Sequence, residues 1–129
     1  MAVDKNMNIL IVDDYTTMLR IIKNLLKQLG FNNVDEATDG TAALEKIKNK
    51  AYGLVISDWN MEPMTGIELL KQVRSSNDNY KNTPFIMVTA ESKTENVIAA
   101  KQAGVNNYIV KPFNAETLKT KMTAVLGDF

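Results

Sequence analysis

Four short runs of apolar residues stand out along the chain, at residues 8–12, 54–57, 85–88 and 108–110. They are rich in β-branched and aromatic side chains, and their apolar residues are consecutive instead of alternating with polar ones. This pattern predicts strands that are buried on both faces of a parallel sheet. A weaker run at residues 33–37 is typical of an edge strand.

Between these runs, apolar residues recur with the period of an α-helix. The clearest such segment starts at Met18, where apolar side chains at offsets 0, 1, 4, 7, 8 and 11 share one face as far as Leu29. Gly30 follows at the position of a C-terminal cap. Apolar residues within 43–47 indicate a second helix.

Three further helices are predicted from their ends. Residues 65–68 and 92–95 each have the pattern of a capping box, a hydroxyl residue followed three positions later by Glu. Asn114 can cap the last helix, which Gly127 ends. Strands and helices therefore alternate five times, which predicts an α/β fold with a parallel sheet and helices on both faces. We find no linker and no repeat, so we expect one domain over residues 1–129 with no output domain.

The composition narrows the possible chemistry. Lys and Arg number 15, Asp and Glu also 15, and the isoelectric point is about 6.3, which does not suit a protein that coats nucleic acid or an anionic membrane. The chain has no Cys and no His, which excludes Ser-His and Cys-His nucleophile pairs and His/Cys zinc sites. The polar start and the lack of a long apolar run lead us to expect a cytoplasmic protein.

In an open parallel sheet, the ligand site lies at the carboxyl ends of the strands. The polar residues that follow the predicted strands are Asp13, Asp14, Asp58, Thr89 and Lys111. We expect these five side chains to converge on one edge of the sheet. An Asp-Asp pair after a strand is also a common helix cap, so this pair alone does not establish a ligand site.

Three carboxylates brought this close repel one another, by about 4 kcal/mol for a close pair at an effective dielectric near 20. Lys111 supplies one compensating charge, and an oxygen-rich acidic pocket is the kind of site that Mg²⁺ prefers. A carboxylate beside a metal ion and an ammonium group is a plausible nucleophile towards phosphorus. Asp58 is the best candidate for the phosphoryl acceptor, because it follows a central strand and precedes an open loop. The Thr89 hydroxyl can hydrogen-bond a transferring oxygen.

Four fragments at successive predicted strand ends resemble those of the response-regulator receiver family. They are Val12-Asp13-Asp14, Ser57-Asp58-Trp59-Asn60-Met61, Val88-Thr89-Ala90-Glu91 and Tyr108-Ile109-Val110-Lys111-Pro112-Phe113. The resemblance extends from about Asn8 to Leu126. It implies a flavodoxin-like (βα)5 fold, a five-stranded parallel sheet with strand order 2-1-3-4-5 and helices on both faces.

The resemblance also implies a role for each matching residue. Asp58 would be phosphorylated by a sensor histidine kinase. The ligands of Mg²⁺ would be Asp13, Asp14, Asp58 and the backbone carbonyl of Asn60. Receiver domains catalyse their own phosphotransfer and dephosphorylation and are not otherwise enzymes.

Four further residues follow from the same resemblance. Thr89 and Lys111 would contact the phosphoryl group. Thr89 would shift towards the phosphate and Tyr108 would turn inward after it, although ordinary packing is the alternative role for Tyr108. The peptide bond between Lys111 and Pro112 is expected to be cis.

The chain departs from the family pattern in the acceptor loop. Glu62 stands between Met61 and Pro63, where the family often has Pro directly after Met. Thr65 precedes Gly66, where Asp or Asn is common. These departures bear on the lifetime of the phosphorylated state and on the identity of any phosphatase.

Within the family, residues 30–34, 58–61 and 89–91 are most similar to chemotaxis members. This implies a chemotaxis histidine kinase upstream, the flagellar motor switch as target, and a phosphatase as a further partner. The signal would be read on the face of the fourth helix, fifth strand and fifth helix. The residues selected on that face are Lys93, Val97, Tyr108 and Lys121. We expect a monomer that binds neither nucleic acid nor membrane.

Several alternatives remain open. The same pocket serves a receiver that only drains phosphate from a shared kinase. A phosphatase that works through an aspartyl-phosphate usually has a second acid two residues after its nucleophile, where this chain has Asn60. A nucleotide- or flavin-binding protein is disfavoured because residues 13–17 contain no glycine. A partner-binding domain without phosphorylation is disfavoured because every group that the chemistry needs is present. Trp59 lines the pocket or lies on plain surface, and we expect Mg²⁺ to change its fluorescence.

Overall fold

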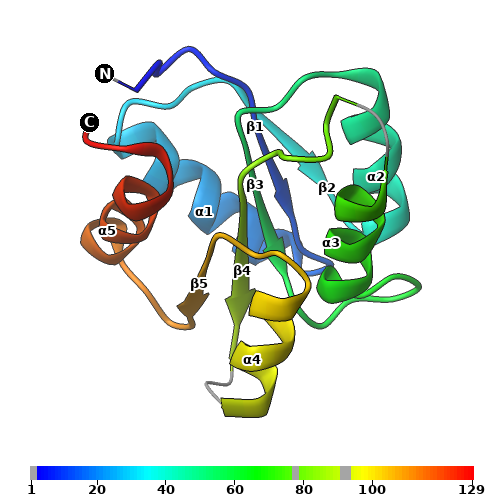
Figure 1. Ribbon diagram of the computed structural model, residues 1–129. Helices are drawn as coiled ribbons and strands as arrows, with labels where there is room; N and C mark the ends of the chain where they lie inside the picture. The colour runs from blue at the N-terminus through cyan, green and yellow to red at the C-terminus, as the bar shows by residue number, and fades with distance from the viewer. Residues whose placement is uncertain (1–2, 77–78, 91–93) are drawn as a thin grey trace.

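The computed structural model describes residues 3–76, 79–90 and 94–129. Its five strands form one parallel sheet in the order β2-β1-β3-β4-β5, which confirms the predicted topology (Figure 1). The strands are β1 (Ile9–Val12), β2 (Val34–Ala37), β3 (Leu54–Asp58), β4 (Phe85–Thr89) and β5 (Asn107–Val110). The helices are α1 (Thr16–Gln28), α2 (Gly40–Asn49), α3 (Gly66–Ser75), α4 (Thr94–Gln102) and α5 (Ala115–Leu126).

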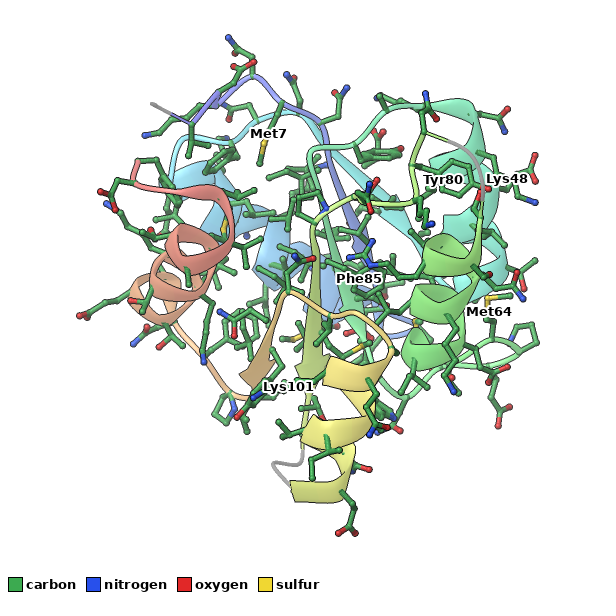
Figure 2. All side chains as sticks on the ribbon, in the orientation of Figure 1. Met7, Lys48, Met64, Tyr80, Phe85 and Lys101 are labelled. Atoms are coloured by element: carbon green, nitrogen blue, oxygen red, sulfur yellow. The ribbon has the colours of Figure 1, made fainter. Side chains whose placement is uncertain are left out.

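Successive residues of each strand point to opposite faces of the sheet, so the core has two layers. Ile9 and Ile11 of β1 belong to one buried cluster, together with apolar residues of α1 and α5. Leu10 and Val12 of the same strand belong to the second core cluster, together with apolar residues of α2 and α3. Figure 2 shows side chains filling both layers, with Phe85 of β4 among them. Both faces are covered, which explains why the central strands are continuously apolar.

The helix ends follow the predicted caps at most positions. Gly30 has φ of 99°, a conformation that glycine adopts easily, just after α1. Thr65 and Glu68 form the expected capping box of α3, and Asn114 accepts a hydrogen bond from the Thr117 amide at the start of α5. The capping box predicted at residues 92–95 includes residues outside the described part of the chain.

No helix among the described residues has the length and apolar character needed to cross a membrane. The longest, α1, has 13 residues. A helix of this length spans about 20 Å, whereas the hydrocarbon core of a bilayer is about 30 Å thick.

Arg74, near the end of α3, joins three segments that lie far apart in the sequence. Its guanidinium group donates hydrogen bonds to the carbonyls of Gly104 (3.0 Å), Lys81 (2.9 Å) and Thr83 (2.7 Å). It also donates to Oδ1 of Asn106 at 2.9 Å. Burial of the guanidinium lowers its pKa from the ordinary value. Arg74 therefore fixes the segment between α4 and β5 against the end of α3.

Replacing Arg74 with Met is expected to lower the free energy of unfolding by roughly 2–4 kcal/mol, because hydrogen bonds from a charged donor are lost and their acceptors are left unpaired. Urea denaturation measures this difference. The control is Lys81→Met, which changes an exposed side chain and leaves the Lys81 carbonyl in place. Equal stability of the two variants would contradict the structural role of Arg74.

Candidate functional site

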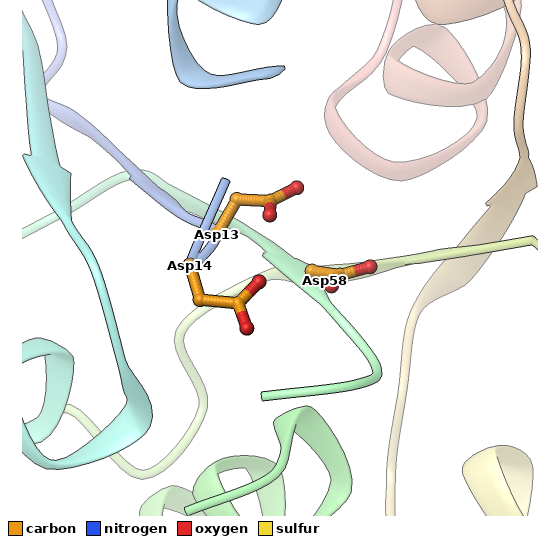
Figure 3. A group of neighbouring side chains, drawn as sticks. All are labelled: Asp13, Asp14 and Asp58. Carbon is orange, nitrogen blue, oxygen red and sulfur yellow. The ribbon is translucent and has the colours of Figure 1, made fainter. Parts of the chain in front are cut away.

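Three carboxylates gather where β1 and β3 end. Asp13, Asp14 and Asp58 each offer an oxygen within 4.8 Å of the others (Figure 3). Asp13 and Asp58 are only 1% and 7% exposed, whereas Asp14 is exposed. The sequence predicted that these three side chains lie close together, and the structure confirms this.

Parallel pairing places these residues at the same height. β1 and β3 are neighbours with Val12 opposite Ser57, so the next residue of each strand reaches the same rim. The Asp13 amide donates to the Ala37 carbonyl at 3.1 Å, and the amide of Trp59, just after Asp58, donates to the Val88 carbonyl at 2.9 Å. The backbone of both acidic segments is thus tied to neighbouring strands.

Lys111 completes the predicted group. Its ammonium nitrogen lies 3.0 Å from Asp58 Oδ1 and 3.4 Å from Asp13 Oδ2, and so bridges the two buried carboxylates. The Lys111 amide donates to the Thr89 carbonyl at 2.8 Å, which anchors the lysine segment to β4. The bond between Lys111 and Pro112 is cis, as the family resemblance implied, and that between Glu62 and Pro63 is also cis.

The ionisation of the site reflects burial and mutual attraction. Burial raises the pKa of the Asp13 carboxyl, and repulsion from Asp58 adds to this; the hydrogen bond from the Tyr15 amide and the charge of Lys111 act in the opposite direction without cancelling it. Burial by itself lowers the pKa of the Lys111 ammonium, but the hydrogen bond and charge of Asp58, with help from Asp13, outweigh it and raise that pKa. Lys111 therefore remains a cation at physiological pH.

The aspartate pair does not serve as a helix cap. The residue at the N-cap position of α1 is Tyr15, which makes no side-chain capping bond. Oδ1 of Asp13 accepts a hydrogen bond from the Tyr15 amide at 2.9 Å, which orients the carboxylate while its other oxygen faces Lys111. These contacts favour a role for the aspartate pair in ligand binding over a role as a helix cap.

The remaining candidates lie around this group. Thr89 is buried at the end of β4, next to the strand that leads to Lys111. Asn60 and Asp14 line one surface hollow of about 350 Å³, together with Met61, Glu62 and Thr65. The two residues that depart from the family pattern, Glu62 and Thr65, therefore border the acidic group directly.

The donors present fit a magnesium ion. Mg²⁺ takes six oxygen ligands at about 2.0–2.1 Å, so ligands around it lie roughly 3–4 Å apart. Three carboxylates with oxygens within 4.8 Å of one another can approach such a geometry with small side-chain movements. The exposed Asp14 leaves one side open to water, which Mg²⁺ usually retains in part.

The residues predicted for a partner surface are only partly gathered. Tyr108 of β5 is half-buried against the second core cluster, and the Lys121 ammonium lies 5.1 Å from the centre of its ring. Val97 is half-buried on α4. Lys93 lies outside the described residues. Tyr108 thus has a packing role, which is compatible with a second position of its ring.

Trp59 is neither fully buried nor plain surface. Its side chain is half-buried and packs against the second core cluster. Trp59 follows Asp58 directly in the sequence, so its fluorescence remains a test of whether Mg²⁺ binding reaches this segment.

Gly66 has a role that the sequence analysis did not assign. A Cβ atom at this position would lie 2.1 Å from the Asp58 carbonyl oxygen and 2.8 Å from Sδ of Met87. The Gly66 amide donates to the Trp59 carbonyl at 2.9 Å, and the Ser57 hydroxyl donates to the Asp58 carbonyl at 3.0 Å. The start of α3 is therefore seated directly on the backbone of Asp58. The only signal in the sequence was a glycine next to a capping threonine.

A family model described as the response regulator receiver domain matches residues 9–123. The chemotaxis protein CheY-3 of Vibrio cholerae is 55% identical over 122 residues, which cover 95% of this chain and 93% of the relative. The chemotaxis protein CheY of Pseudomonas aeruginosa is 53% identical over 119 residues, or 92% and 95% of the two chains.

Solved structures with the same fold include two that bear on the site. The chemotaxis protein CheY4 of Vibrio cholerae superposes with a TM-score of 0.87 at 37% identity, over 94% of this chain and 99% of that chain. The receiver domain of a Pseudomonas aeruginosa sensor histidine kinase superposes with a TM-score of 0.85 at 25% identity, over 95% and 99%. That second structure is described with a magnesium ion coordinated in its active site cleft.

Adding one methyl group at Gly66 is expected to displace Asp58 and weaken Mg²⁺ binding roughly tenfold. Calorimetry and the fluorescence of Trp59 measure the affinity. Alanine favours helices over glycine by about 1 kcal/mol, so a loss of affinity in Gly66→Ala cannot be ascribed to a weaker helix. The control is Gly53→Ala, whose added methyl meets the side chain of Met7. Unchanged Mg²⁺ affinity in Gly66→Ala would refute the positioning role.

The raised pKa of Asp13 predicts how stability depends on pH and metal. A carboxyl whose pKa rises on folding stabilises most below its unfolded pKa, and loses this contribution as the pH rises through its folded pKa. Without metal, Asp13→Asn should therefore be more stable than wild type at pH 7, and the difference should shrink as the pH falls towards the ordinary Asp pKa of about 3.9. Added Mg²⁺ should favour wild type, because only the carboxylate binds it.

Urea denaturation in chelator and in Mg²⁺ measures this effect. The comparison variant is Asp35→Asn, since the Lys50 ammonium and the Tyr52 hydroxyl, by hydrogen bonding, lower the pKa of that carboxyl. Its substitution should destabilise the protein at pH 7, the opposite sign. A loss of stability in metal-free Asp13→Asn at pH 7 would contradict the prediction.

Proposed function

The chain belongs to the response regulator receiver domain family, and from that premise we propose that it is a chemotaxis response regulator switched by phosphorylation of Asp58. The observation that carries the proposal is the Lys111 ammonium bridging Asp58 and Asp13 beside a third carboxylate. A structural ion pair needs only one acid. An extra acid held close to it is costly unless cations are bound there, which suits a site built for a metal ion and a phosphoryl group.

The metal site follows from the same geometry. Asp13, Asp14, Asp58 and the backbone carbonyl of Asn60 would hold Mg²⁺. Bound there, the ion supplies positive charge to the oxygens of the transferring phosphoryl group. The structural relative described with magnesium in its cleft supports this choice of ion.

The reaction is a transfer of phosphorus to a carboxylate oxygen. An Asp58 oxygen forms the new bond to phosphorus as the bond from phosphorus to the donor atom breaks, and the donor keeps that electron pair. For a phosphohistidine donor, the leaving atom is an imidazole nitrogen. Lys111, which holds Asp58 Oδ1 before transfer, can follow the phosphoryl oxygens afterwards without giving up its proton. The Thr89 hydroxyl donates to one of those oxygens.

The site is suited to holding the phosphoryl group longer than a dedicated phosphatase would. A phosphatase that turns over an aspartyl-phosphate uses a second carboxylate as a general base that takes a proton from the attacking water. Two residues after Asp58 the chain has Asn60, whose side-chain amide cannot act as a base. We therefore propose self-catalysed phosphotransfer and slow dephosphorylation as the only reactions of this domain.

The output is proposed to travel from β4 to β5. The phosphoryl group carries about −1.5 to −2 charges and three acceptor oxygens, which would draw Thr89 towards the pocket. Thr89 pairs with Val110, and Met87 of the same strand pairs with Tyr108. Movement of the Thr89 side chain towards the pocket would free space for the Tyr108 ring, and would change the face that carries Val97, Tyr108, Lys121 and the undescribed Lys93.

This face is proposed to bind the flagellar motor switch, with a chemotaxis histidine kinase upstream and a phosphatase as a further partner. The chemotaxis names of the relatives at 53–55% identity support this assignment. We propose that the protein acts as a monomer in the cytoplasm.

The phosphoryl acceptor is tested by incubating the protein with acetyl phosphate, with and without Mg²⁺, and measuring the intact mass. Wild type should gain one phosphoryl group only when Mg²⁺ is present, and Asp58→Asn should gain none. Asp35→Asn, which removes a carboxylate that is paired with Lys50 away from the site, should behave as wild type. A metal-dependent gain in Asp58→Asn would overturn the assignment of the acceptor.

The phosphorylated sample also separates the two receiver roles. A motor regulator should bind purified motor switch protein at least roughly tenfold more tightly after phosphorylation, a coupling typical of such switches. Equal binding before and after would leave the phosphoryl acceptor standing and assign the chain to the phosphate-sink role.

A further inference from the structure

A groove runs along the open edge of the sheet, outside the site described above. β2 is the edge strand and pairs only with β1. In Figure 1 it lies between α1 and α2. A cavity of about 540 Å³ opens there, with walls from α1 and α2 and a base from the end of β2. Its volume falls within the usual range for ligand pockets.

The outer edge of β2, which continues from the groove, offers backbone groups that pair with no strand in the described part of the chain. The carbonyls of Asn33 and Ala37 accept hydrogen bonds from β1. In a parallel ladder alternate residues turn their N–H and C=O groups to the same side, so those of Val34 and Glu36 point away from β1 towards the open edge. Such a row of donors and acceptors is a template for another extended chain.

The walls of the groove carry an excess of positive charge. Arg20 and Lys23 extend from α1 and Lys46 from α2, whereas Glu36 is the one acidic residue of the lining. Within the described residues, none of the three cations takes part in an ion pair. The chain as a whole has no net charge, so this local excess is not a consequence of composition.

The groove also has apolar surface. Leu19, Ala37 and Ala42 contribute to its lining; Leu19 and Ala37 are almost completely buried, so the half-buried Ala42 offers the exposed apolar surface of the three. An extended peptide presents alternate side chains to opposite sides, so one side chain can rest on this apolar surface while its neighbours face the cations.

We propose that the edge of β2 is a docking site for an extended acidic segment of a partner protein. The segment adds to the sheet as a sixth strand, its carboxylates face Arg20, Lys23 and Lys46, and an apolar side chain rests on Ala42. A second copy of this chain is a poorer occupant, because a two-fold interface would bring the same cations together. The inference does not depend on phosphorylation of Asp58.

The test uses NMR on the full chain with a blocked (Glu-Val)4 peptide as probe and a blocked (Lys-Val)4 peptide for comparison. The acidic peptide should slow hydrogen exchange at the amides of Val34 and Glu36 and shift resonances of α1 and α2. The basic peptide should do neither. Arg20→Glu with Lys23→Glu should weaken binding of the acidic peptide by roughly tenfold or more.

The matched control is the double variant Lys81→Glu with Lys101→Glu, which makes the same change in net charge at exposed positions outside the groove. It should bind the acidic peptide as wild type does. The proposal is overturned if the acidic peptide leaves Val34 and Glu36 unprotected. It also fails if both double variants lose affinity equally, or if protection grows with protein concentration alone, as a second copy would produce.

Discussion

The contact of the Lys111 ammonium with Asp58 and Asp13 holds the functional rim together. Two nearly buried carboxylates and a third beside them repel one another, and burial removes most of the water that would otherwise screen the repulsion. Lys111 offsets part of this cost, as the raised pKa of its ammonium shows. The balance is incomplete, since the pKa of Asp13 remains raised as well. The rim therefore carries negative charge that Lys111 offsets only in part.

The parallel sheet makes this arrangement possible. Each strand of the pair β1 and β3 is covered on both faces, so neither strand can shift without opening the core. The residues at the strand ends are therefore held in place. Gly66 contributes to this because it lets α3 pack directly on the Asp58 carbonyl. Tyr108 lies two residues before the end of β5 and keeps some exposure. The pairing of β4 with β5 thus connects the rim, where Thr89 ends β4, with the less constrained Tyr108 ring.

Charge is distributed unevenly over a chain that is neutral overall. Carboxylates dominate the rim at the ends of β1 and β3, with Glu62 at its border. Cations from α1 and α2 dominate the open edge of β2. The two regions therefore differ in the sign of their local charge.

Much of this protein was determined by local sequence pattern. The alternation of strands and helices, the caps at Thr65 and Asn114, and the glycine after α1 depend on neighbouring residues alone, so they were predicted correctly. The meeting of Asp13, Asp58 and Lys111 was also predicted correctly, because strand ends in a parallel sheet lie at one rim and these ends carry the polar side chains. The apolar pattern begins at Met18, two residues after α1 starts, because its first residues, Thr16 and Thr17, are polar.

Other features were decided only by the tertiary structure. The seating of Gly66 against Asp58, the Arg74 hydrogen bonds to Gly104 and Asn106, and the cationic groove beside β2 all join segments that are separate in the sequence. Sequence pattern reports which face of an element is buried. It does not report the distance between two packed elements, because the side chains of the whole core set that distance. This distance determines which backbone groups meet and which remain open.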